Sequence, residues 1–280
     1  MELLPVDAKE PDPVVIDRAA ARIRDGHLVA FPTETVYGLG ANALDERSIA
    51  RIYEAKGRPK HNPVIVHVAD VAAARGVVAK WPRVAEQLAA RWWPGPLTIV
   101  LDKHASIPDS VTAGLTKVGV RVPAHPVALA LLRAAGVPIA APSANRANGV
   151  SPTTAQHVQS SLPDADVLVL DGGSCIVGIE STVLDLSGAV PTLLRPGGVS
   201  RTEIEQELGM PILLAEANDD GDARRAAPGM LKKHYAPRAK LVRIPHGDVN
   251  AMTRAIAEAG RDGELVAALA IGERVCAAAA

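Results

Sequence analysis

Cysteine is scarce in this 280-residue sequence, which contains only Cys175 and Cys276. Two cysteines so far apart in the chain cannot build a disulfide framework, and they lack the spacing of a metal site. A reducing, cytoplasmic setting is therefore expected.

The N-terminal stretch MELLPVDAKEPDPVV is acidic and contains prolines, unlike a secretory or transit peptide. No uninterrupted apolar stretch is long enough to span a bilayer, so we expect no membrane segment.

Aromatic residues and net charge are also low. The chain has three tryptophans, three tyrosines, one phenylalanine and a formal net charge of −1. Such a charge gives no general attraction to nucleic acids or anionic membranes, so any strong positive field must be local. Hydrophobic residues make up 48% of the sequence, mostly as aliphatic side chains, and this is typical of α/β proteins.

Helix and strand patterns alternate along most of the chain. Asp12 with Pro13 begins one helix, Asp45 begins another that ends at Gly57, and apolar strands are expected at 27–31, 63–68 and 97–101. Near residues 181–196, two strands follow each other with only a turn between them. The pattern predicts an α/β fold with a twisted mixed β-sheet flanked by helices. We expect a catalytic domain at 1–209, a linker at 210–239 and a short C-terminal α/β extension at 240–280.

Two nucleotide-binding motifs can be excluded. GLGANA (38–43) has the glycine spacing of a dinucleotide fingerprint, but PTETVY separates it from the preceding strand and the next helix begins only at Asp45. The chain also has no Walker-type phosphate loop, and no nucleophile–base pair stands out. Covalent catalysis is not indicated.

Positively charged residues gather in EAKGRPKHNPVIVHV (54–68). Lys56, Arg58 and Lys60 repel one another, yet Gly57 and prolines give the stretch a defined shape. It is either a solvated loop or a preorganised seat for an anion. Two strand arginines, Arg121 and Arg195, need anionic partners if they are buried, and together they suggest a shared anionic ligand.

Polar side chains follow two other strands. Thr33, Glu34 and Thr35 follow the strand at 27–31, and APSAN places Ser143 and Asn145 after another. Ligands bind at such positions in open α/β sheets, although hydroxyl-rich turns also satisfy their own backbone. Ser151 before Pro152 is either a helix N-cap or part of a phosphate site. His67 alone is more typical of a satisfied core histidine.

Taken together, PTETVYGLGANA, KGRP with NPVIVHV, WWPGPLTIVL, VGVRVP, APSAN, GIESTVLDL, LLRPGG and PGMLKKHYAP occur in the order seen in one family. The chain resembles the YrdC-type threonylcarbamoyl-AMP synthases in their long form, over residues 12–240. Lys56, Arg58, Ser143 and Asn145 form the K-x-R plus S-x-N hallmark. The resemblance implies a YrdC/dihydroxybutanone-phosphate-synthase-like fold and the conversion of L-threonine, bicarbonate and ATP to threonylcarbamoyl-AMP and pyrophosphate. Mg²⁺ is the implied cofactor, held mainly by the ATP phosphates rather than by protein side chains.

The resemblance also implies roles for individual residues. Lys56 and Arg58 would offset the charge of the polyanion during catalysis. The implied threonine or carbamate contacts are Thr35, His67, Arg121, Ala141 and Ser181. The implied nucleotide contacts are Arg58, Asn62, Lys117, Ser143, Asn145, Ser151, Arg195 and the linker residue Tyr235, which would close over the nucleotide. The product would pass to a tRNA-modifying threonylcarbamoyl-transferase complex, with weak or no direct tRNA binding.

Two features depart from the family pattern. Lys117 occupies a position where a small hydroxylated residue is usual, so only a backbone or altered contact is implied there. The C-terminal extension is much shorter than the family's second domain. Three alternatives remain open on sequence: an RNA-binding module, another carbamoyl transferase of the same fold, and a regulatory protein that binds threonine or nucleotide without turnover.

Overall fold

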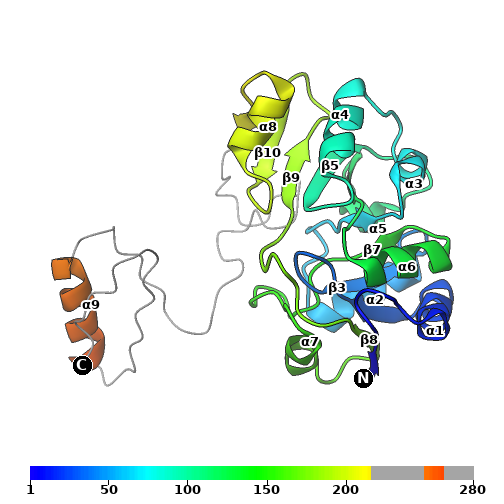
Figure 1. Cartoon of the computed structure of the whole chain (residues 1–280), viewed down its shortest axis with the longest axis horizontal. Helices are drawn as coiled ribbons and strands as arrows, with labels where there is room; N and C mark the ends of the chain where they lie inside the picture. Colours follow the sequence, from blue (N-terminus) through cyan, green and yellow to red (C-terminus); the bar gives the residue numbers. More distant parts are fainter. Residues whose placement is uncertain (216–248, 262–280) are drawn as a thin grey trace. The chain divides into compact units, whose positions relative to one another are not determined.

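A computed structural model describes residues 1–215 and 249–261 (Figure 1). The chain divides into two units, Met1–Ala236 and Pro237–Ala280. In the second unit the structure describes one helix, α9 (Val249–Arg261), within the predicted C-terminal α/β extension. Residues 216–239 of the predicted linker lie outside the described residues, whereas its first residues include the short strand β11 (Leu213–Leu214). The three-part division of the chain stays a prediction.

One eleven-stranded mixed sheet organises the first unit, with strand order β1-β8-β2-β3-β7-β4-β6-β5-β9-β10-β11. The strands are β1 (Glu2–Pro5), β2 (Leu28–Phe31), β3 (Gly38–Asn42), β4 (Val66–His67), β5 (Leu97–Asp102), β6 (Lys117–Arg121), β7 (Ile139–Ala140), β8 (Val167–Asp171), β9 (Thr182–Asp185), β10 (Thr192–Arg195) and β11 (Leu213–Leu214). Parallel and antiparallel pairs alternate irregularly across it, and β9 and β10 form the predicted antiparallel pair. The predicted mixed α/β sheet is confirmed.

Eight helices of this unit flank the sheet: α1 (Pro13–Arg24), α2 (Glu46–Lys56), α3 (Val71–Val77), α4 (Arg83–Trp92), α5 (Asp109–Thr112), α6 (Pro126–Ala135), α7 (Ala155–Ser161) and α8 (Arg201–Leu208). The predicted caps are present. Asp12 and Asp45 accept hydrogen bonds from the first turns of α1 and α2, and Gly57 ends α2 in a left-handed conformation. No helix within the described ranges is long and apolar enough to cross a membrane.

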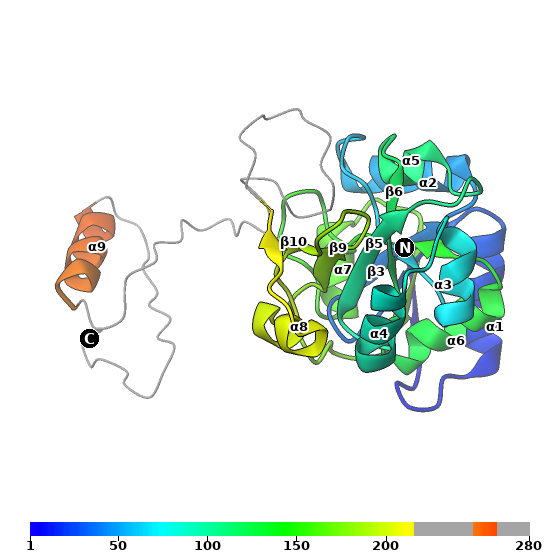
Figure 2. The same cartoon turned by 90° about the horizontal axis from the view of Figure 1, so that it is seen from above.

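The alternating side chains of β2 pack into two separate cores. Val29 and Phe31 join a core formed with α1 and α6, which lie side by side (Figure 2). Leu28 and Ala30 face the larger core that contains α2. Because successive residues of a strand point to opposite faces, this short apolar strand is buried on both sides. It therefore fixes the position of the polar segment that follows it, residues 33–37.

β4 and β7 are shorter than the sequence predicts. The predicted strand 63–68 forms a ladder only at Val66–His67. Pro63 has no N–H to donate, and the amide of Val64 donates to Val111 outside the sheet. The carbonyl of Ile65 accepts from Ala141, just beyond β7. The hydrogen-bonded ladder of β4 is therefore limited to Val66–His67, and residues 63–65 lie outside it.

The GLGANA segment is strand β3 rather than a phosphate loop, and its glycines allow close packing. A Cβ at Gly40 would lie 2.7 Å from the ring of Phe31 and 2.9 Å from Cγ2 of Ile139. Both neighbours are themselves buried, so neither can move away freely.

We therefore expect Gly40→Ala to lower the free energy of unfolding by about 1–3 kcal/mol through overpacking. Gly76→Ala is the matched control, because a Cβ there meets nothing within 4 Å inside helix α3. That control is expected to be neutral or to stabilise by up to about 1 kcal/mol. Urea denaturation of the two variants measures both values, and equal stabilities would contradict the packing argument.

Candidate active site

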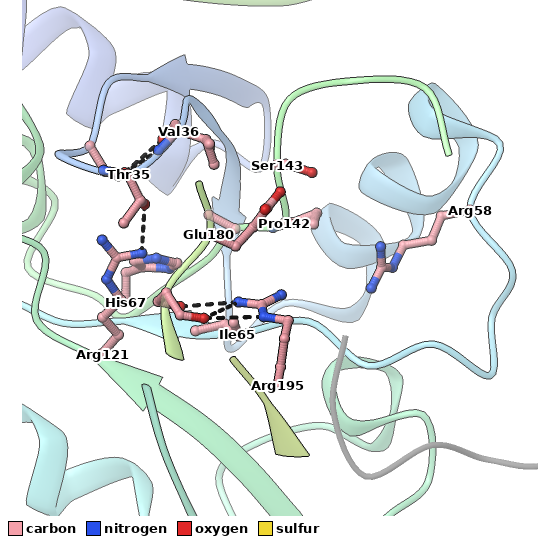
Figure 3. Close-up of a pocket in the computed structure, with 14 residues that line it drawn as sticks. Thr35, Val36, Arg58, Ile65, His67, Arg121, Pro142, Ser143, Glu180 and Arg195 are labelled. Atoms are coloured by element: carbon pink, nitrogen blue, oxygen red, sulfur yellow. Dashed lines mark hydrogen bonds between the residues drawn. The ribbon is translucent and has the colours of Figure 1, made fainter. Parts of the chain in front are cut away.

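A pocket that is open to solvent, with an empty volume of about 500 Å³, lies where several strands of the sheet end (Figure 3). Its walls come from the segment after β2, the ends of β4, β6 and β10, the segment after β7 and the residues before β9. The lining residues are Thr33, Thr35, Val36, Gly38, Arg58, Ile65, His67, Arg121, Ala141, Pro142, Ser143, Glu180, Ser181 and Arg195.

The sheet brings His67 and Arg121 together. They are the last residues of the parallel strands β4 and β6 and are directly paired in register. Thr35 approaches them from the segment after β2, whereas Arg58 lies on the opposite side of the pocket (Figure 3). We call Thr35, His67 and Arg121 the Arg121 end, and Arg58 with Ser143 the Arg58 end.

Arg121 is buried and held by three contacts. Its Nε donates to the carbonyl of Gly95 (3.1 Å), its Nη1 to Oγ1 of Thr35 (3.0 Å) and its Nη2 to Oε1 of Glu34 (2.6 Å). Burial lowers the pKa of Arg121, while the charge of Glu34 opposes that shift. The strand arginine thus has an anionic partner within the protein.

His67 is also buried. Burial and the charge of Arg121 lower the pKa of His67 to about 3, so its ring is neutral at physiological pH. Its Nδ1 has no hydrogen-bond partner within the described part of the chain. A buried polar atom without a partner inside a pocket is unusual, and it marks His67 as a candidate ligand contact rather than a satisfied core histidine.

The cationic stretch is neither wholly solvated nor wholly directed at the pocket. Lys60 is exposed, whereas Lys56 and Arg58 are buried. Arg58 donates from Nε to the carbonyl of Asn62 (3.1 Å) and from Nη2 to that of Pro63 (2.8 Å). These two backbone acceptors fix the position of the guanidinium group.

Lys56 joins α2 to the segment after β7. Its Nζ donates to the carbonyls of Ser143 (2.5 Å) and Asn145. Burial and the neighbouring Arg58 lower the pKa of Lys56, and the charge of Glu180 opposes the shift. Lys56 is not among the lining residues, so it supports the pocket wall rather than facing the cavity.

Side chains of the same wall bond to one another. Ser143 Oγ donates to Oδ1 of Asn145 (2.6 Å), whose Nδ2 donates to the carbonyl of Gly149 (2.7 Å). Ser151 donates to the carboxylate of Glu180. The N-cap interpretation of Ser151 is wrong, because α7 begins at Ala155 and Thr154 caps it.

Arg195 closes the pocket from β10. Its Nη2 donates to the carbonyl (2.8 Å) and Oγ (3.1 Å) of Ser181, and Ser181 Oγ also contacts Oγ1 of Thr98 (2.8 Å). With Arg58 and Arg121, it gives the pocket wall three guanidinium groups. A pocket so lined is suited to a ligand that carries several negative charges.

Comparison with known proteins agrees with this chemistry. A family model described as telomere recombination matches residues 21–197, and one described as threonylcarbamoyl-AMP synthase, C-terminal domain, matches residues 199–278. The threonylcarbamoyl-AMP synthase of Bacillus subtilis is 45% identical over 260 residues, which is 92% of this chain and 75% of that protein. The chain belongs to the threonylcarbamoyl-AMP synthase family.

Two further members show how far the similarity extends. The threonylcarbamoyl-AMP synthase of Pyrococcus abyssi is 47% identical over 244 residues, covering 86% of this chain and 70% of that protein. The crystal structure of P. abyssi Sua5 complexed with L-threonine superposes with a TM-score of 0.88 at 44% identity, covering 94% of this chain and 78% of that one. The family resemblance drawn from the motifs is confirmed.

The structure brings most of the predicted site residues together. The predicted residues that line the pocket are Thr35, Arg58, His67, Arg121, Ala141, Ser143, Ser181 and Arg195. Lys56, Asn62, Asn145 and Ser151 each contact a lining residue instead. Tyr235 lies outside the described residues. Lys117 is the exception, because its Nζ pairs with Asp185 (3.0 Å) and it is not part of the lining.

Six lining residues were not among the predicted site residues: Thr33, Val36, Gly38, Ile65, Pro142 and Glu180. Glu180 is the most unexpected, since it is the one carboxylate among the lining residues of a pocket suited to anions. The sequence did contain one indication that Glu180 belongs to the site, because it directly precedes the predicted site residue Ser181 in the GIEST motif. Glu34 was seen as part of a polar cluster, but its pairing with Arg121 was not predicted.

Lys56→Met should destabilise the protein as well as impair function. The substitution leaves the carbonyls of Ser143 and Asn145 without their donor, and each buried unsatisfied group costs about 1–3 kcal/mol. Chemical denaturation compared with Lys60→Met, in which an exposed lysine of the same cationic stretch is replaced, measures the difference. Equal stabilities would show that Lys56 does not hold the loop.

His67 predicts a pH dependence of stability. Its folded pKa, about 3, lies below its ordinary value of 6.5, so unfolding takes up a proton as the pH falls between these values. Stability is therefore fully present above pH 6.5 and lost below it, at up to about 1.4 kcal/mol per pH unit. Relative to His67→Gln, the wild type should lose this extra stability between pH 6.5 and pH 4.5. Parallel pH profiles of the free energy of unfolding would contradict the assignment.

Proposed function

We propose that the chain converts L-threonine, bicarbonate and ATP to threonylcarbamoyl-AMP, pyrophosphate and water. The observation that carries this proposal is the similarity to named threonylcarbamoyl-AMP synthases, which runs through the pocket-forming part of the chain. A pocket with three arginines supports it, since the reaction gathers a carboxylate, a carbamate and a triphosphate. Their mutual repulsion has to be offset by fixed positive charges.

We assign the amino acid to the Arg121 end. The P. abyssi relative was solved with L-threonine, and in this chain Arg121, Thr35 and His67 converge on one side of the pocket. Arg121 would bind the carboxylate, with Ser181 and Ala141 near the rest of the amino acid. The nucleotide would lie toward Arg58, Ser143 and Arg195, positioned from behind by Asn62, Asn145 and Ser151.

Two bond-forming steps follow in the proposed reaction. The α-ammonium of threonine first loses a proton, and the resulting amine bonds to the carbon of bicarbonate with release of water, so that a carbamate forms. A carbamate oxygen then attacks the α-phosphorus, and the bond from that phosphorus to the bridging oxygen of the β-phosphate breaks. Negative charge grows on the departing pyrophosphate, which Arg58 would stabilise from a fixed position. Lys56 would act by holding the wall that carries Ser143.

Mg²⁺ is proposed as the cofactor. The described residues include no cluster of three or more His, Cys, Asp or Glu side chains that could hold a metal ion. The ion would be held mainly by ATP phosphates and water, and Glu180 is the one carboxylate among the lining residues, a ligand type that Mg²⁺ accepts. When bound, it would neutralise phosphate charge.

The remaining parts of the proposal concern the setting and partners. A cytoplasmic location agrees with the cysteine content, and the product would pass to a tRNA-modifying threonylcarbamoyl-transferase complex, with little direct tRNA binding by this chain. Tyr235, in the linker, would close over the nucleotide and keep water from the labile adenylate.

Pyrophosphate release with ATP, Mg²⁺ and bicarbonate tests the function. We expect release to require L-threonine and to be absent without an amino acid. L-serine should give a kcat/KM lower by about tenfold or more, since it lacks one methyl group.

Arg58→Ala should lower kcat/KM at least about 100-fold. Arg75→Ala is the control, because Arg75 is an exposed partner of Glu86 far from the lining. Release without threonine, or full activity of Arg58→Ala, would contradict the proposal.

A further inference from the structure

Glu34 is a buried carboxylate whose two oxygens are both occupied by the protein. Oε1 accepts from Arg121 Nη2 at 2.6 Å, and Oε2 accepts from the amide of Ala124 at 3.0 Å. Its side chain is 6% exposed and is not part of the pocket lining. Glu34 therefore acts on a ligand through Arg121 and not by direct contact.

Arg121 keeps donors for a ligand despite this pairing. A guanidinium carries five N–H groups, and three are used by Gly95, Thr35 and Glu34. The remaining two, one on each terminal nitrogen, have no partner within the described part of the chain. They suffice for a two-point contact with a carboxylate. Arg121 thus offers hydrogen bonds into the pocket while its charge is already matched.

Glu34 forms the ion pair with Arg121, and the other charged groups of the pocket lie around this pair. His67, the register partner of Arg121, is neutral at physiological pH. Arg58 lies across the pocket, and the carboxylate of Glu180 extends toward Ser143 and away from Arg121 (Figure 3). Arg195 is a further cation that acts on Arg121, and its guanidinium group donates to Ser181.

We propose that Glu34 makes the Arg121 end selective for a zwitterion, because it neutralises Arg121 and leaves the ligand's carboxylate in need of a positive charge on the ligand itself. An α-ammonium next to the carboxylate supplies that charge. A 2-hydroxy acid of the same shape has the carboxylate alone, so its binding would add uncompensated negative charge beside Glu34. This inference rests on the proposed placement of the amino acid at the Arg121 end and names Glu34 as a specificity-determining residue.

The test compares two ligands in the absence of ATP and bicarbonate. L-threonine and its 2-hydroxy analogue, 2,3-dihydroxybutyrate of matching configuration, are titrated by calorimetry into wild type, Glu34→Gln, Glu34→Asp and Glu86→Gln. Wild type should favour threonine. Glu34→Gln should reduce the ratio of the two affinities at least about tenfold, as expected for the loss of one nearby charge in a partly desolvated pocket.

The controls separate charge from structure. Glu34→Asp keeps the charge and should preserve the preference for threonine even if both ligands bind more weakly. Glu86→Gln removes an exposed carboxylate and should leave the ratio unchanged. If Glu34→Gln weakens both ligands equally, Glu34 only supports Arg121 and the proposal is wrong.

Two further outcomes are decisive. Should Glu34→Gln fail to fold by circular dichroism, the wild-type ratio decides: the proposal requires threonine to bind at least about tenfold more tightly, and equal affinities overturn it. Absence of threonine binding to wild type would instead contradict the proposed function itself.

Discussion

Buried positive charge is the constraint on which this site depends. Lys56, Arg58, Arg121 and Arg195 are all less than a tenth exposed, and each must be stabilised without water. Backbone carbonyls accept hydrogen bonds from Lys56, Arg58 and Arg195, and a carboxylate accepts from Arg121. A carbonyl satisfies an N–H group, whereas the carboxylate of Glu34 also balances the charge of Arg121.

The pairing with Glu34 gives the Arg121 end of the pocket its own electrostatic character. That end presents hydrogen-bond donors whose charge is matched, together with a neutral histidine and threonine hydroxyls. At the Arg58 end, carbonyls of its own loop fix the guanidinium group. In the proposed function the Arg121 end would take the zwitterionic amino acid, and the polyanionic nucleotide would lie toward Arg58.

The sequence predicted the large elements well and the site partly. Helices α1 and α2 were predictable because Asp12, Asp45 and Gly57 are local end signals. The short ladders of β4 and β7 were not, because their ends depend on hydrogen bonds between segments distant in sequence, such as Ala141 to Ile65. An apolar run gives no information about where such a ladder stops.

For the site residues, the sequence could not predict the direction in which each side chain points. Lys56 and Arg58 are two residues apart, yet Gly57 turns the chain in a left-handed conformation between them. Spacing alone therefore could not indicate that Arg58 faces the cavity and Lys56 faces a loop. Lys117 shows the same limit, since its charge is matched by Asp185 from a different strand, 68 positions further along the chain. Motif matching located the segments, and only tertiary contacts separate lining residues from supporting ones.

Lys56 and Arg58 consequently influence the same end of the pocket by different physical routes. Arg58 takes its carbonyl partners from its own loop, at Asn62 and Pro63, so its position is set locally. Lys56 ends α2 and donates to the opposite wall, at Ser143 and Asn145. Because the amide of Ala147 also donates to the carbonyl of Lys56, the helix end and that wall are joined in both directions. Lys56 therefore links the segment that carries Arg58 to the segment that carries Ser143. The Arg58 end of the pocket is thus preorganised because two chain segments are held together. The charge of any single side chain is only one part of that preorganisation.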